Sequence, residues 1–82
     1  MTQQLNENPF VRTQDLALAT AISLSFPIES IDRQNPRKAQ FIFKRNPKLD
    51  EFIERYWHRK IKVEPTVYFE ALRVIKGRLY EN

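Results

Sequence analysis

The chain has 82 residues, of which 41% are hydrophobic and 12% aromatic, and its 14 basic and ten acidic side chains give a net charge of +4. This length predicts a single domain with an efficiently packed core, because a small domain buries only about 60% of its unfolded surface. No cysteine is present, which excludes disulfides and thiolate chemistry and is typical of a cytoplasmic protein. No apolar run approaches the ~20 residues of a membrane span, so we expect no membrane association.

The N-terminal part predicts a leader followed by a buried helix. Residues 1–9 are polar and end in an Asn-Pro pair, which indicates a flexible leader before one domain over residues 10–82. Leu16–Leu24 is apolar nearly all round a helix, with Thr13 as its expected N-cap and Asp15 in its first turn. Such a helix is buried on more than one side, so we expect it at the centre of the core. The alternative is that one of its sides faces a partner or a second copy of the chain.

A β-hairpin is predicted next. Ile28–Arg33 is a weak strand, and Asp32–Lys38 is a polar turn around an Asn-Pro pair. Lys38–Lys44 alternates cleanly between the two faces of a strand, which places Phe41 and Phe43 together on the core side.

Two amphipathic helices complete the expected domain. Asn46 and Pro47 begin the first as N-cap and first helical residue. Its apolar stripe consists of Leu49, Phe52, Ile53 and Tyr56. Ile61–Glu64 breaks the helical pattern and predicts a short third strand. The last helix is expected from Pro65 to Tyr80, with a core stripe of Tyr68, Leu72, Ile75 and Leu79. The expected order, helix, strand, strand, helix, short strand, helix, predicts a small α+β domain with an antiparallel hairpin packed against helices.

Residues typical of catalysis or metal binding are sparse. The single histidine, His58, lies among basic residues near a helix end, and a zinc site with one histidine is uncommon. Acidic residues cluster at the start of the same helix, where complementing the helix dipole explains them. No phosphate-binding loop, HExxH, GxSxG or CxxC pattern occurs. We therefore expect no enzymatic activity, no metal and no cofactor.

The basic side chains are more informative about function, because Lys and Arg contacts with phosphates dominate the affinity of proteins for nucleic acids. The candidate phosphate contacts lie in the hairpin turn and on the last two helices: Arg33, Arg37, Lys38, Arg59, Lys60, Lys62, Arg73 and Lys76. Phe69 and Tyr80 share a helical stripe with the last two of these and would act as stacking platforms for bases. The sequence thus predicts a small basic binding protein whose partner is a nucleic acid, DNA or RNA, or a nucleoprotein complex.

Two other interpretations of the same residues stay open. The charges are also explained as ordinary solvated faces, with Phe69 widening the core stripe and Tyr80 ending a helix. The second alternative is a protein–protein interaction module or homodimer without nucleic-acid binding, anchored by Trp57, Phe69 and the Leu16–Leu24 helix. Between Trp57 and Lys62 a large aromatic and a basic run leave a helix together, so we expect that segment to border any site.

The chain also resembles a family. The positions that carry the resemblance are Phe10, Thr13, Asp15, Leu16 and Ala19, then Phe41, Phe43 and Tyr56, then Val63, Pro65, Tyr68, Ala71, Leu72 and Lys76. This pattern, over residues 10–79, resembles small bacterial, phage and plasmid proteins that are catalogued as a domain of unknown function. The resemblance implies a cytoplasmic protein encoded on a mobile element. It implies no catalytic or binding residue, and it favours nucleic-acid binding only by association.

Overall fold

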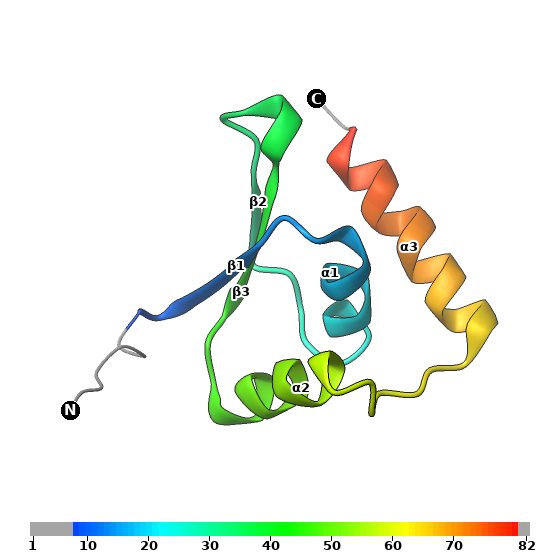
Figure 1. Ribbon diagram of the computed structural model, residues 1–82. Helices are drawn as coiled ribbons and strands as arrows, with labels where there is room; N and C mark the ends of the chain where they lie inside the picture. The colour runs from blue at the N-terminus through cyan, green and yellow to red at the C-terminus, as the bar shows by residue number, and fades with distance from the viewer. Residues whose placement is uncertain (1–7, 81–82) are drawn as a thin grey trace.

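A computed structural model describes residues 8–80, in which a three-stranded antiparallel sheet has α-helices on one side (Figure 1). The elements, in chain order, are β1 (Phe10–Thr13), α1 (Leu16–Ser23), β2 (Ser30–Asp32), a 3₁₀ turn (Pro36–Lys38), β3 (Gln40–Lys44), α2 (Pro47–Trp57) and α3 (Pro65–Leu79). The predicted α+β class, with an antiparallel hairpin packed against helices, is confirmed. Most of the predicted leader, residues 1–7, lies outside the described residues.

The third strand lies elsewhere than the sequence indicated. Residues 61–64 form no strand; instead β1 pairs antiparallel with β3, so the sheet order is β1-β3-β2. The start of β1 is held by Arg45, whose backbone N–H donates to the Pro9 carbonyl at 2.9 Å and whose Nε donates to the Asn8 carbonyl at 2.8 Å. Strand β3, which carries the strongest alternation in the sequence, is therefore central and paired on both edges.

The cap of α1 also differs from the prediction. Thr13 is the last residue of β1, and its hydroxyl oxygen accepts a hydrogen bond from the Asp15 backbone N–H at 3.0 Å. Asp15 is the N-cap, because its Oδ1 accepts from the Leu18 backbone N–H at 3.1 Å. A carboxylate at the N-cap also complements the helix dipole. The start of α1 is therefore well stabilised although Asp15, rather than Thr13, is its cap.

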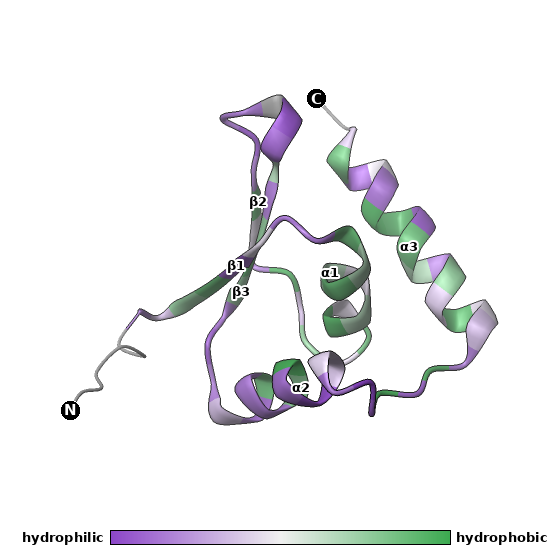
Figure 2. Ribbon diagram, in the orientation of Figure 1, coloured by the Kyte–Doolittle hydropathy of each residue, from purple (hydrophilic) through white to green (hydrophobic). Residues whose placement is uncertain are grey.

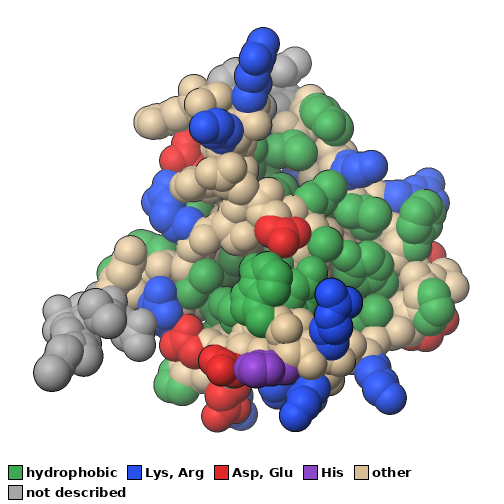
Figure 3. Space-filling model, in the orientation of Figure 1, with side chains coloured by type: hydrophobic (Ala, Val, Ile, Leu, Met, Phe, Trp, Pro, Cys, Tyr) green, Lys and Arg blue, Asp and Glu red, His purple; other side chains and the backbone are tan. Residues whose placement is uncertain are grey.

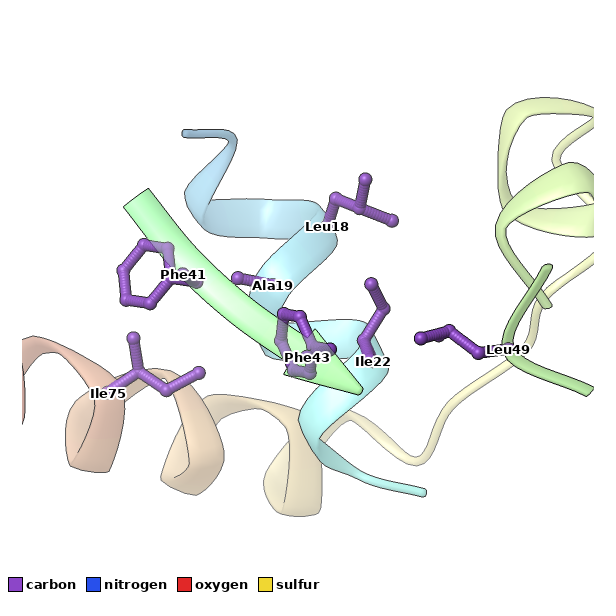
Figure 4. Packing of buried hydrophobic residues seen from close by; sticks show 7 residues of the cluster. All are labelled: Leu18, Ala19, Ile22, Phe41, Phe43, Leu49 and Ile75. Carbon is purple, nitrogen blue, oxygen red and sulfur yellow. The ribbon is translucent and has the colours of Figure 1, made fainter. Parts of the chain in front are cut away.

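The core lies between the sheet and the helices, with α1 at its centre. Phe43, Ile22 and Leu49 have no exposed surface, and Ile75 of α3 is 2% exposed. In the close view, Ile75 reaches toward Phe41 of β3, and Leu49 toward Ile22 (Figure 4). Hydrophobic residues extend along α1, whereas hydrophilic ones predominate in the hairpin turn (Figure 2). The expected central core helix is confirmed, since residues 18–22 are all buried by the chain itself.

The two later helices begin as predicted. The Asn46 side chain accepts from the Leu49 backbone N–H at 2.9 Å, and the Glu64 carboxylate accepts from the Val67 backbone N–H at 2.8 Å. Each helix then has a proline in its first turn, where the missing N–H costs no hydrogen bond. The helices turn their predicted stripes inward, but only Leu49 and Ile75 become fully buried.

Replacing Gly77, a residue of α3, tests whether the helix surface around it is free of contacts. A Cβ at this position would meet no atom within 4 Å, and the glycine does not have a positive φ. We expect Gly77→Ala to stabilise the protein by ~0.5–1 kcal/mol, because alanine loses less backbone entropy in a helix. Thermal unfolding followed by circular dichroism should show a Tm higher by about 2–8 °C. A lower Tm would show that this helix surface is occupied.

Candidate functional site

The hairpin turn and the C-terminal end of α3 meet at one end of the molecule. An Arg33 Nη2 donates a hydrogen bond of 2.5 Å to the backbone carbonyl of Arg78, which joins the turn to the last turn of the helix. The turn itself is ordered by Asn35, whose side chain accepts from the Arg37 backbone N–H at 3.1 Å. We call the cations of these two segments the basic end: Arg33, Arg37, Lys38, Lys76 and Arg78. The sequence predicted four of them and missed Arg78, which carries no pattern of its own.

The other predicted cations are elsewhere. Arg59, Lys60 and Lys62 lie in the connection between α2 and α3, at the opposite end of α3 from the hairpin turn (Figure 1). Because α3 has 15 residues and a helix rises 1.5 Å per residue, the two groups are separated by roughly 22 Å along its axis. Arg73 lies on α3 itself, beside Glu70 in a shallow depression. The eight predicted residues therefore do not form one patch.

The aromatic candidates are exposed. Phe69 is 58% exposed and Tyr80 76%, so the alternative in which Phe69 widens the core stripe is wrong. Trp57 is 60% exposed, and its ring lies edge-to-face against that of Tyr56, with ring centroids 5.1 Å apart. The alternative function, an interaction module, retains these exposed rings. Residues 18–22 of α1 are buried by the chain itself and are not exposed as an anchor for that module.

A groove of about 410 Å³ opens beside Trp57. We call it the aromatic groove; its lining comes from α1, α2, the α2–α3 connection and α3, and consists of Ala21, Tyr56, Trp57, Arg59, Ile61, Val63 and Tyr68. Hydrophobic side chains gather over these elements on the face shown in Figure 3, with basic and acidic side chains beside them. Tyr68 is held in place by a hydrogen bond of 3.2 Å from its hydroxyl to the Ala17 carbonyl. The predicted segment from Trp57 to Lys62 thus borders this groove.

Arg59 enters the groove from an uncommon backbone conformation. Its φ of 61° is the one positive φ of a non-glycine residue among the described residues. Its backbone N–H donates to the Tyr56 carbonyl at 3.0 Å, and that of Lys60 donates to the Arg55 carbonyl at 2.9 Å. These two hydrogen bonds form a Schellman motif at the C-terminal end of α2. Arg59 occupies the left-handed position of this motif, where glycine is usually found. The chain therefore changes direction after α2 at Arg59, an arginine rather than a glycine.

The groove has charge of both signs near its phenols. Burial raises the pKa of the Tyr56 hydroxyl above 10, and the nearby Asp15 carboxylate and Tyr68 phenol raise it further. The Arg59 guanidinium acts on the same pKa in the opposite direction. The Tyr56 hydroxyl is thus neutral at physiological pH, and it lies within electrostatic reach of an acid and a base.

The His, Asp and Glu side chains of residues 8–80 do not gather in threes at a place that could hold a metal ion. His58 Nε2 lies 3.5 Å from Glu54 Oε2, but both side chains are more than 60% exposed, and exposed pairs contribute little. Within residues 8–80, no three His, Asp or Glu side chains cluster in a way that would hold a metal ion. The described helices include none that is long and apolar enough to cross a membrane.

Of the comparisons with known proteins, the one with protein-family models gives a match. Comparison with curated proteins and with solved structures finds nothing similar to this chain. A family model described as a domain of unknown function, DUF5659, matches residues 10–81. Nearly the whole folded chain is covered, from the first residue of β1 past the end of α3. The protein therefore belongs to the DUF5659 family, as the resemblance in its sequence implied.

Proposed function

We propose that the protein is a non-enzymatic binding protein that contacts nucleic acid, alone or within a nucleoprotein complex, through its basic end. The observation that carries this proposal is the hydrogen bond from Arg33 to the Arg78 carbonyl, which brings two basic segments distant in the sequence to one place. Phosphates repeat along a nucleic acid, so several cations held on a fixed framework match it better than scattered ones do.

The charge of the basic end is not offset locally. Residues 33–38 and 71–80 contain no Asp or Glu. Asp32, which precedes the turn, is engaged by Arg12 at 2.7 Å. Arg37 and Lys38 are exposed, and neither side chain forms an ion pair within residues 8–80. Their positive charge is thus available to phosphates. Tyr80, the C-cap of α3, has an exposed ring and follows Arg78 by two residues.

Salt dependence tests the proposal. If all five cations of the basic end contact phosphates of a duplex, the slope of log affinity against log salt is about −4.5. Affinity for labelled DNA, measured by fluorescence anisotropy, should then fall about 500-fold between roughly 50 and 200 mM salt. Single-stranded DNA and RNA titrated in parallel would distinguish the preferred nucleic acid. Absence of binding to all of them at the lower salt would overturn the proposal.

A pair of double variants locates the contact surface. Arg37→Ala with Lys38→Ala should lower affinity about tenfold or more and make the salt slope shallower by about 1.8, the share of two phosphate contacts. The matched control is Lys48→Ala with Arg55→Ala, which removes the same charge from the exposed side of α2. Equal losses in both variants would show that net charge, rather than the basic end, attracts the nucleic acid.

Membership of the DUF5659 family is compatible with this function. The resemblance to phage and plasmid proteins supports the proposal through the association of mobile elements with nucleic-acid transactions. A cytoplasmic location, which the absence of cysteine favours, would give the protein access to such a partner.

A further inference from the structure

The aromatic groove contains an exposed side chain, that of Trp57, which lies outside the core cluster and outside the basic end. Three aromatic rings line it, from Tyr56, Trp57 and Tyr68, and Trp57 is 60% exposed. A large ring left in water contributes little to the stability of its own domain, whereas exposed rings provide stacking platforms for bases. The volume of about 410 Å³ lies within the roughly 300–1,000 Å³ of small-molecule sites.

The conformation of Arg59 points to an anion at this groove. Left-handed backbone geometry costs roughly 1–2 kcal/mol for a residue with a side chain, and glycine would close the same helix end without that cost. An arginine here brings a guanidinium to a wall of aromatic rings, and it makes no ion pair within residues 8–80. Lys60 and Lys62, both exposed, alternate along the chain with the lining residues Arg59, Ile61 and Val63 and add positive charge to this segment. Guanidinium groups match phosphate oxygens in geometry as well as in charge.

The Asp15 carboxylate provides a negative charge near the groove, in addition to the positive charge of Arg59. It is close enough to raise the pKa of the Tyr56 phenol, and only its Oδ1 is used in capping α1. Nucleobases present N–H donors on their edges, which a carboxylate can accept, while their phosphates are anionic. A groove with aromatic walls, a cation at one edge and an acid nearby therefore complements a ligand with a flat base and a phosphate.

We propose that the aromatic groove binds a single nucleotide, with its base against Trp57 and its phosphate at Arg59. This site lies at the opposite end of α3 from the basic end and is independent of the proposed function. Its ligand is either a free nucleotide or one unpaired nucleotide of a strand, since both present the same base and phosphate.

The chain contains one tryptophan, so its fluorescence reports directly on the groove. Nucleoside monophosphates of each base should quench Trp57 emission along a saturable curve, and nucleosides lacking the phosphate should bind about tenfold more weakly. Inorganic phosphate alone should leave the emission unchanged. Short single-stranded oligonucleotides distinguish the two sources, because tighter binding per strand than per mononucleotide identifies a nucleotide within a chain. Quenching that rises linearly without saturation, equally for nucleosides and nucleotides, would overturn the proposal.

A matched pair of variants assigns the phosphate contact. Arg59→Gln should lower nucleotide affinity about tenfold, the loss expected for one charge-assisted contact, whereas Arg55→Gln should not. Arg55 is the appropriate control because it lies among acidic side chains of α2 in a separate depression. Equal affinity in the two variants would refute the assignment. Arg37→Ala with Lys38→Ala should leave mononucleotide binding unchanged, which keeps this test separate from that of the basic end.

Arg59→Gly adds a readout that a merely structural arginine would not give. Glycine relieves the backbone strain at φ 61°, so this variant should unfold at a Tm about 4 °C higher than the native protein. It should nevertheless lose nucleotide affinity to the same extent as Arg59→Gln. A residue kept for folding would show the reverse, with lower Tm and unchanged binding.

Discussion

Replacing Phe43 by alanine is expected to lower the free energy of unfolding by ~3–5 kcal/mol, the range for a buried phenylalanine. The ring has no exposed surface and belongs to the central strand of the sheet. It lies opposite Val11 of β1 in the register and belongs to the buried cluster that includes Ile22 of α1. Its removal leaves a cavity that both the sheet and α1 border. Urea denaturation followed by circular dichroism measures the effect.

The loss is large for this protein, because domains are typically stable by only ~5–15 kcal/mol and small ones lie toward the lower limit. Phe69→Ala is the matched control, since it is the same substitution at a side chain that is 58% exposed on α3. We expect it to change stability by less than about 1 kcal/mol. If the two variants unfolded at the same urea concentration, the assignment of Phe43 to the core would be wrong.

Sequence patterns predicted those parts of the fold that depend on local periodicity. The alternation around Phe41 and Phe43 indicates a strand with one core face, and helical spacing places Leu49 and Ile75 inward. Both assignments are confirmed, because the repeat of a strand or helix determines which face a residue occupies. The cap at Asn46 was also predictable from the sequence, since its side chain accepts from a backbone N–H only three residues further along.

Pairing between distant segments was not predictable in this way. Residues 10–13 (FVRT) and 61–64 (IKVE) are both short and each contain two apolar and two polar side chains, and this local composition does not distinguish a strand from a connection. Residues 10–13 become the third strand because they pair with the edge of β3 that β2 leaves free. This pairing places Val11 opposite Phe43, where it packs against the core. Residues 61–64 instead join α2 to α3 and contribute Ile61 and Val63 to the aromatic groove.

The candidate sites follow the same division. The sequence identified most of the residues assigned to the two proposed sites, but their grouping depends on two tertiary features. One is the hydrogen bond from Arg33 to Arg78, which spans 45 residues and assembles the basic end. The other is the reversal at Arg59, which turns the chain between α2 and α3 and sets Trp57 facing a groove. A left-handed arginine has no sequence signature, because its conformation comes from the neighbours that constrain it.

The attachment of α3 gives the second large effect. Ile75 is the one fully buried side chain of this helix, and it reaches toward Phe41 of the sheet (Figure 4). Ile75→Ala should lower the free energy of unfolding by ~2–4 kcal/mol. The matched control is Val74→Ala on the next residue, whose side chain is 62% exposed and whose loss should cost less than about 1 kcal/mol.

The way in which Ile75→Ala destabilises the protein bears on function. With this anchor weakened, α3 should detach before the sheet unfolds, so its backbone amides should exchange with deuterium faster than those of β3. A detached α3 breaks the hydrogen bond between Arg33 and the Arg78 carbonyl, which separates the halves of the basic end. Nucleic-acid affinity should therefore fall in Ile75→Ala although no cation is removed, and should be retained in Val74→Ala. Undiminished affinity in a variant whose α3 amides exchange freely would show that the hairpin turn binds without the helix.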